Sequence, residues 1–249
     1  MARTMPEEST SPPKVAPPVA ADRPVRSGRF RFSAAQFLIS LVFVFIAFPF
    51  VEFFQNGDTI EAWLMTLVLV SGVLAVARRR RTLVLALVLV SPALLARWLK
   101  IFWDDVVPPE VYLVPALFFV GFVMLQFLYF ILRAPRVNSE VLCAGISVYL
   151  LLGIIWMFAY ILVARIHPES FAYNVGAPPV HSIASFDAFY FSFITLSTVG
   201  YGDITPVTRV ARTLAMTEAM TGTLYMAVLI SRLVALYSSQ GPEESKKSD

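Results

Sequence analysis

The six residues from Thr198 to Asp203 read Thr-Val-Gly-Tyr-Gly-Asp, a composition suited to holding a cation with the protein backbone. A potassium ion leaves water only where a ring of oxygens replaces its hydration shell, and backbone carbonyls are oxygens without a full charge. A strand aims successive carbonyls at one axis when its residues alternate between ordinary and left-handed backbone conformations. Glycine reaches the left-handed region without steric penalty, so Gly200 and Gly202 stand where this geometry needs them.

The other residues of the segment have supporting positions in the same geometry. Val199 and Tyr201 alternate with the glycines, so we expect their side chains to point backwards into protein and to brace the strand. Thr198 adds a hydroxyl oxygen at the inner end, and Asp203 adds negative charge at the mouth. One chain supplies only part of such a ring, so the arrangement predicts four copies around a common axis. The alternative is an outer turn that contains glycine and is capped by Asp203.

This segment resembles the selectivity filter of potassium channels, whose loops read T-V-G-Y-G. The residues from Thr195 to Thr198 resemble the end of that family's pore helix, and those from Asp203 to Pro206 resemble its outer mouth. The short pattern gains weight because it lies between two long apolar segments near the C-terminus. The resemblance implies a homotetramer in the cell membrane that conducts K⁺ and needs no cofactor. Its K⁺ ligands would be backbone oxygens of Thr198, Val199, Gly200 and Tyr201, with Gly202 completing the ion-binding segment.

The composition of the chain is that of a membrane protein. Of the 249 residues, 57% are hydrophobic and only 15% are charged, and the mean hydropathy is +0.70. A soluble domain of this length would carry more charge, so we predict an all-α integral membrane protein. The basic residues lie beside apolar spans, which argues against nucleic acid as a partner. Cys143 is the single cysteine, and no set of nucleophile and base is found, so we do not expect an enzyme.

Apolar runs divide the chain into a four-span block followed by a pore domain. A polar tail at 1–28, which we expect to be disordered, precedes the block at 29–136, and a short polar tail follows at 239–249. The predicted spans of the block are 32–54, 60–77, 82–101 and 111–132. The pore domain, 137–238, contains a fifth span at 141–165, a pore helix at 186–197, the filter at 198–203 and a sixth span at 210–237. The pore helix is too short to cross a bilayer, so we expect it to be re-entrant.

Basic residues predict the orientation of the chain in the membrane. With the N-terminus inside, the inner side gains the run from Arg78 to Arg81 together with Arg133 and Arg136. The outer side has fewer basic residues, and cytoplasmic loops are usually the more basic ones. We therefore expect both termini in the cytoplasm and the filter at the outer face of the cell membrane.

The fourth span departs from the pattern of voltage-gated channels with six spans. Their fourth span carries a basic residue at every third position, whereas the stretch from Val111 to Leu132 contains no lysine or arginine. A conventional voltage sensor is therefore not expected, and the block is either a structural collar or a sensor of an unidentified signal. Glu52 and Glu61 lie near outer span ends and are interpreted as hydrated boundary residues.

Three basic residues near span ends are interpreted as snorkelling side chains. Arg97 and Lys100 would reach the outer surface opposite Asp104 and Asp105, and Arg232 would reach the cytoplasm.

The pore helix carries residues that we expect to hold the filter in place. Many relatives have a Trp pair where this chain has Tyr190 and Phe191, and a hydrogen bond from Tyr190 to Asp203 would replace the one that an indole gives. Thr195 is a second candidate for filter support. Ile194 stands where some bacterial relatives carry a glutamate, which removes a carboxyl partner for Asp203.

The sixth span contains one carboxylate, Glu218, and an ionisable residue at membrane depth is a functional candidate. It would either form a charged ring that concentrates potassium or be a protonated acid bonded to the pore helix. Gly222 follows one turn later on the same face and is either a hinge or a site of close packing on the pore helix. Thr223, Met226 and Ile230 are the candidates for lining the cavity.

The sequence thus predicts passive, potassium-selective conduction. One alternative is a weakly selective cation channel, which flux measurements with K⁺ and Na⁺ would separate. Another is a non-conducting regulatory membrane subunit, which would give neither flux nor four-fold assembly. The sequence does not indicate the gating stimulus or any accessory subunit.

Overall fold

Helices make up most of the chain that the computed structural model describes, namely residues 34–77, 80–102, 108–174, 183 and 185–238. Within these residues, six helices are long and apolar enough to cross a membrane by length and composition. They match the predicted spans within a few residues at each end. The predicted tails at 1–28 and 239–249, and the pair Asp104 and Asp105, lie outside the described residues.

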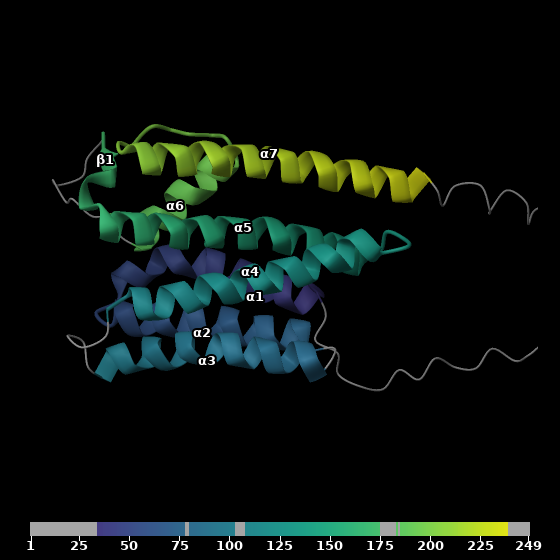
Figure 1. Cartoon of the computed structure of the whole chain (residues 1–249), viewed down its shortest axis with the longest axis horizontal. Helices are drawn as coiled ribbons and strands as arrows, with labels where there is room; N and C mark the ends of the chain where they lie inside the picture. Colours follow the sequence, from purple (N-terminus) through teal and green to yellow (C-terminus); the bar gives the residue numbers. More distant parts are fainter. Residues whose placement is uncertain (1–33, 78–79, 103–107, 175–182, 184, 239–249) are drawn as a thin grey trace, which may run out of the picture. The chain divides into compact units, whose positions relative to one another are not determined.

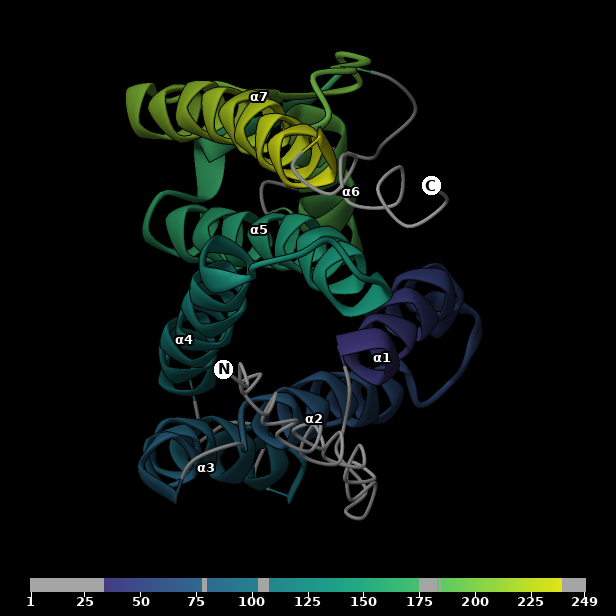
Figure 2. The same cartoon turned by 90° about the vertical axis from the view of Figure 1, so that its right-hand side faces the viewer.

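The first four spans are helices that follow one another along the chain. They are α1 (Ala34–Ala47), continued by the 3₁₀ turn η1 (Phe48–Phe53), α2 (Gly57–Val76), α3 (Arg80–Phe102) and α4 (Glu110–Arg133). The C-terminal part consists of the long helices α5 (Ser139–Ile166) and α7 (Arg209–Ser238), with the short α6 (Ser185–Leu196) between them in the chain. Figures 1 and 2 show α5 between α7 and the first four helices.

Local chemistry accounts for where α5 begins and for how closely it approaches α6. The side chain of Asn138 caps the first turn of α5, since its Oδ1 accepts a hydrogen bond from the Val141 amide at 3.0 Å. On α5, a Cβ atom at Gly153 would stand 2.6 Å from Cε1 of Phe193. Only glycine lets the Phe193 ring of α6 lie on the backbone of α5 at this point.

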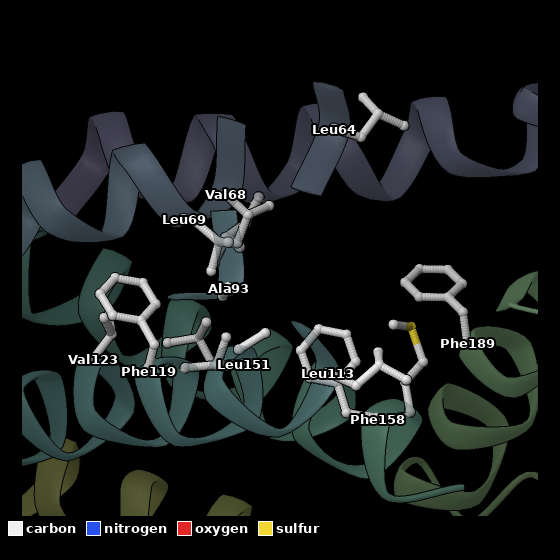
Figure 3. Close-up of a cluster of buried hydrophobic side chains, with 14 of the residues drawn as sticks. Leu64, Val68, Leu69, Ala93, Leu113, Phe119, Val123, Leu151, Phe158 and Phe189 are labelled. Atoms are coloured by element: carbon white, nitrogen blue, oxygen red, sulfur yellow. The ribbon is translucent and has the colours of Figure 1, made fainter. Parts of the chain in front are cut away.

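One apolar core runs through the first four spans and continues into α5 and α6 (Figure 3). Among its buried members are Leu69 of α2, Phe119 of α4 and Leu151 of α5. The aromatic rings of Phe37 in α1 and Phe127 in α4 stack with their centroids 5.1 Å apart. The division of the chain at residue 136 stays a prediction, and the core crosses it without interruption.

A pair of three-residue strands lies beside the filter segment. Strand β1 (Phe171–Tyr173) follows α5 and the 3₁₀ turn η2 (Pro168–Ser170), and strand β2 (Ile204–Pro206) follows the filter segment. The two strands are antiparallel, with Tyr173 opposite Ile204. The sequence analysis predicted no strand between the fifth span and the pore helix, so β1 was missed. Pairing of the two strands thus connects the residues after Asp203 to the segment that follows α5.

Candidate functional site

The short helix α6 is held on two sides by aromatic contacts. Towards α5 and β1, the ring of Phe191 lies edge-on to Tyr160 and Phe171, with centroid distances of 4.9 and 5.4 Å. Towards the first span, the ring of Phe189 lies 5.1 Å from each of Phe45 and Phe48. Aromatic pairs at such distances add specific orientation to their apolar burial. The first span and α5 therefore both fix the position of α6, which begins and ends one residue earlier than predicted.

The backbone that follows α6 alternates between two conformations, as the sequence predicted. Gly200 and Gly202 have φ angles of +53° and +79°, and Thr198 has a φ angle of +61°. The glycines adopt the left-handed region freely, whereas a β-branched residue rarely does so. Such a conformation at a non-glycine residue is typical of functional sites. The left-handed positions therefore begin at Thr198, two residues before the first glycine.

The amide groups of the filter segment point back to the C-terminal end of α6. The amide of Thr198 donates to the Thr195 carbonyl at 2.9 Å, and those of Val199 and Gly200 both donate to the Ile194 carbonyl, at 2.9 and 3.2 Å. In a trans peptide the N–H and the preceding C=O point in opposite directions. The carbonyl oxygens of Ser197, Thr198 and Val199 therefore all point away from α6. In these contacts Thr195 supports the segment through its backbone.

The outer end of the segment is anchored by Asn174, directly after β1. Its Nδ2 donates to the carbonyl of Gly202 at 2.7 Å, and its backbone amide donates to the carbonyl of Asp203, also at 2.7 Å. The Gly202 carbonyl thus accepts a hydrogen bond from the protein. Gly202 contributes to the filter segment through its left-handed backbone conformation. No local pattern around Asn174 indicated this role, because its partners lie about 30 positions further along the chain.

Tyr190 of α6 reaches the predicted mouth residue. Its hydroxyl donates to Oδ2 of Asp203 at 2.7 Å, while the amide of Ile204 donates to Oδ1 at 3.0 Å. The bond from Tyr190 is the main reason why the pKa of the Asp203 carboxyl lies below its usual value, and the Ile204 amide adds to the effect. The same bond raises the pKa of Tyr190 to about 12. The hydrogen bond expected from the sequence is thus present.

Glu218 of α7 is completely buried where α5, α6 and α7 meet. Its Oε2 contacts the hydroxyl of Tyr160 in α5, and its Oε1 lies 2.6 Å from Oγ of Ser192 in α6. Ser192 Oγ also lies 2.8 Å from the carbonyl oxygen of Gly153 in α5. Of the two alternatives drawn from the sequence, these contacts match the acid that is bonded to the pore helix.

Gly222 lies one turn after Glu218 and contacts the end of α6. A Cβ atom at Gly222 would collide with the Leu196 carbonyl oxygen and stand 2.9 Å from Cδ1 of Leu196. This close approach matches the packing role that was one of the two predictions for Gly222. Glu218 and Gly222 together join α7 to the short helix that precedes the filter segment.

Several predicted site residues are exposed on the surface of the single chain, as far as the structure describes it. Val199 and Tyr201 are 53% and 73% exposed, so protein of the same chain does not cover them, and their expected bracing of the strand stays a prediction for the assembled protein. The three cavity candidates Thr223, Met226 and Ile230 are exposed as well. Along α7, the buried residues are Ala211, Glu218, Gly222 and Leu236. Most of the apolar surface of α7 is therefore open to lipid or to other chains.

Arg97 is not a snorkelling residue, which corrects the sequence interpretation. Its side chain is only 3% exposed, and its Nη2 donates to the Asp58 carbonyl at 2.9 Å and lies 3.8 Å from Oε2 of Glu61. The guanidinium group also stands 5.2 Å from the centre of the Tyr112 ring. Glu61 is therefore the partner of a buried cation rather than a hydrated boundary residue, because α2, α3 and α4 meet at this point.

The pair of Arg97 and Glu61 is connected to α6. The side chain of Ser185, the first residue of α6, lies close enough to the Glu61 carboxyl to act on its ionisation. A carboxylate at this position suits the partial positive charge at a helix N-terminus. A polar neighbour at the beginning of α6 thus adds to the aromatic contacts of Phe189 between the four-span block and α6. Lys100, the other predicted anchor, has its amine 6.0 Å from the Tyr112 ring centre.

Arg232, the third predicted snorkelling residue, caps another helix. Its Nη2 donates to the carbonyls of Leu132 and Ala134, at 3.1 and 3.2 Å. These are carbonyl groups at the C-terminal end of α4, which attracts cations. The side chain therefore joins the far half of α7 to the four-span block.

Known proteins resemble the C-terminal part of the chain. Residues 166–239, which include the filter segment, α6 and α7, match the sequence model of a family described as an ion channel. The two-pore potassium channel 4 of Arabidopsis thaliana is 47% identical over 49 residues, which are 20% of this chain and 17% of that protein. The two pore potassium channel c of Oryza sativa subsp. japonica is 38% identical over 68 residues, 27% of this chain and 14% of that protein.

A third relative comes from a bacterium. The inward rectifier potassium channel Kirbac3.1 of Paramagnetospirillum magnetotacticum is 42% identical over 52 residues, which are 21% of this chain and 18% of that protein. The matched part of this chain thus spans less than a fifth of each of these relatives. These similarities point to an ion channel pore domain within an all-α integral membrane protein, and not to an enzyme.

Proposed function

We propose that this chain forms a potassium-selective channel in which four copies surround one pore. The observation that carries the proposal is the direction of the peptide groups after α6. The carbonyls of Ser197, Thr198 and Val199 share one direction, away from α6, because the amides of the next residues donate to carbonyls at its end. Four such rows of oxygens around an axis could replace the hydration shell of K⁺.

The electrostatics of α6 support a cation at the inner end of this row. The filter segment follows the C-terminus of α6, where the helix dipole leaves partial negative charge. At the other end, Asp203 supplies a carboxylate whose lowered pKa keeps it ionised at neutral pH. Both ends of the segment therefore favour cations over anions.

The exposed surfaces of the single chain fit an assembly of four. Val199, Tyr201 and the cavity candidates Met226 and Ile230 are exposed although they are apolar or aromatic. Neighbouring copies would cover the first two, and the cavity candidates would face the common axis. In this proposal both termini lie in the cytoplasm, and the cell membrane is the location. The stretch from Val111 to Leu132 has no basic residue, so conventional voltage sensing in α4 is not part of the proposal.

The test is flux through purified protein in liposomes, with a matched pair of glycine variants. Gly200→Ala puts a side chain where φ is +53°, although nothing lies within 4 Å of the new Cβ atom. Gly121→Ala is the control, because its Cβ atom also meets nothing within 4 Å but lies in the helix α4. We expect Gly200→Ala to abolish K⁺ flux with the tetramer intact, and Gly121→Ala to conduct normally.

Three results would contradict the proposal in different ways. Undiminished, K⁺-selective flux from Gly200→Ala would refute the assignment of the filter. Equal flux of K⁺ and Na⁺ through the unmodified protein would indicate a weakly selective cation channel. The absence of both flux and four-fold assembly would indicate a non-conducting membrane subunit.

A further inference from the structure

The contacts of Glu218 raise a question about where the protons are. The carboxyl group contacts the hydroxyl of Tyr160 through Oε2 and the hydroxyl of Ser192 through Oε1. The same Ser192 hydroxyl lies 2.8 Å from the carbonyl oxygen of Gly153. Three helices thus meet in one chain of oxygen atoms, and each neighbouring pair is close enough to need a proton between them.

A count of donors distinguishes the two states of Glu218. A serine hydroxyl has one proton, and both a carboxylate and a backbone carbonyl only accept. If Glu218 is ionised, Ser192 can donate either to Glu218 or to Gly153, so one short O···O contact has no proton. If Oε1 of Glu218 is protonated, it donates to Ser192, Ser192 donates to Gly153, and Tyr160 donates to Oε2. Every contact then has its hydrogen bond.

The surroundings of Glu218 also disfavour a charge. The side chain has no exposed surface. Among the described residues, Tyr160 of α5 contacts it and Tyr149 of α5 lies near enough to be influenced by it, whereas α6 faces it with the neutral Ser192. The salt bridge found among the described residues joins Arg97 and Glu61 and does not involve Glu218. An ionised carboxylate that is buried without a cation is strongly destabilising.

We infer that Glu218 carries a proton in the conducting protein and positions α6 as a hydrogen-bond donor, in a relay from Tyr160 through Glu218 and Ser192 to Gly153. This inference rests on the proposed function, since it assigns a condition for conduction. Ionisation of Glu218 in alkaline solution removes the donor to Ser192, so α6 keeps only one of its two bonds, either to Glu218 of α7 or to Gly153 of α5. Conduction then falls as the pH rises.

Glutamine at position 218 is the variant that separates the two states. Its Oε1 can accept from Tyr160 and its Nε2 can donate to Ser192, so all the hydrogen bonds of the relay are kept and none can be lost by ionisation. We expect Glu218→Gln to conduct like the unmodified protein at neutral pH and to keep its flux in alkaline solution, where the unmodified protein loses it. Glu218→Ala and Ser192→Ala interrupt the relay, and we expect each to lower the flux about tenfold.

The pH profile has an internal control. Other groups that titrate in alkaline solution are the same in the unmodified protein and in Glu218→Gln, so the difference between the two profiles belongs to Glu218. A glutamine variant that loses flux as severely as Glu218→Ala at neutral pH would overturn the relay. An alkaline decline that is identical in both proteins would overturn it as well.

Infrared spectroscopy tests the proton without any flux measurement. The spectrum of the unmodified protein minus that of Glu218→Gln should contain the C=O stretch of a protonated carboxylic acid at neutral pH, and this band should disappear at alkaline pH. A carboxylate band at neutral pH would refute the inference even if the protein conducts K⁺. If the protein does not conduct but the acid band is present, the proposed function fails and the protonation of Glu218 stands.

Discussion

Gly222 of α7 lies directly against the carbonyl group of Leu196, the last residue of α6. A Cβ atom at Gly222 would stand 3.2 Å from the Leu196 carbonyl carbon and would collide with the oxygen. The obstacle is backbone, which cannot rotate aside as a side chain does. The absence of a side chain at Gly222 is therefore what allows α7 to approach the helix that leads into the filter segment.

The first prediction concerns this contact. Gly222→Ala should destabilise the protein by about 1–3 kcal/mol because the added methyl group overpacks the junction of α6 and α7. The same change at an open helical position, Gly121→Ala, should be neutral or stabilising, by up to about 1 kcal/mol, since alanine favours helix. Thermal unfolding of the purified protein in detergent measures both. Equal stability of the two variants would refute the packing role of Gly222.

The second prediction concerns acid inhibition at the mouth. The pKa of Asp203 is lowered in the folded protein, so its charge and its bond to Tyr190 are present above the usual aspartate range and are lost only as the pH falls through the lowered value. Tyr190→Phe removes the main cause of the lowering. We expect the acid-side decline of K⁺ flux to move to higher pH in this variant.

The control for this experiment is Asp203→Asn, which has no carboxyl group to titrate. Its flux should be lower than that of the unmodified protein and should lack the acid-side step that Tyr190→Phe displaces. An unchanged acid profile in Tyr190→Phe would mean that the bond does not set the charge of Asp203. The pKa of Tyr190 near 12 keeps its own hydroxyl protonated throughout such a scan.

The third prediction concerns the buried cation of the four-span block. Arg97→Met leaves Glu61 without its partner, and removing one member of a buried pair typically destabilises by about 3–5 kcal/mol. The 27% exposure of the Glu61 side chain lets water offset part of this loss. Glu61→Gln combined with Arg97→Met should therefore recover much of the stability.

Denaturant or thermal unfolding of the two single variants and the double variant gives the coupling between Arg97 and Glu61. Arg136→Met, at an exposed position after α4, is the control for loss of positive charge and should have little effect. Additive effects of the two substitutions at Arg97 and Glu61 would contradict the pairing.

Features that depend on local chemistry were predictable from the sequence. Span lengths follow from runs of apolar residues, and the left-handed positions at Gly200 and Gly202 follow from the freedom of glycine. The bond between Tyr190 and Asp203 was also accessible, because the spacing from the pore helix to the filter mouth is short and fixed by the motif.

Features that depend on how distant helices meet were not predictable. Arg97 near a span end looks the same in sequence whether it snorkels or pairs with Glu61 on another helix. A charged ring and a protonated acid would both appear in the sequence as one glutamate at membrane depth. Only the positions of Tyr160 and Ser192 distinguish these two roles of Glu218. Strand β1 has three residues, too few for a period of two to be recognised, so the role of Asn174 next to it was missed as well.

The guanidinium group of Arg232 fastens α7 to the end of α4 at the carbonyls of Leu132 and Ala134. In the proposed channel, a rotation of the C-terminal half of α7 that widened the pore would therefore move α4 with it or break both bonds. The first four helices would then oppose the opening motion mechanically, so α4 could resist or assist opening through its tilt although it has no basic residue between Val111 and Leu132.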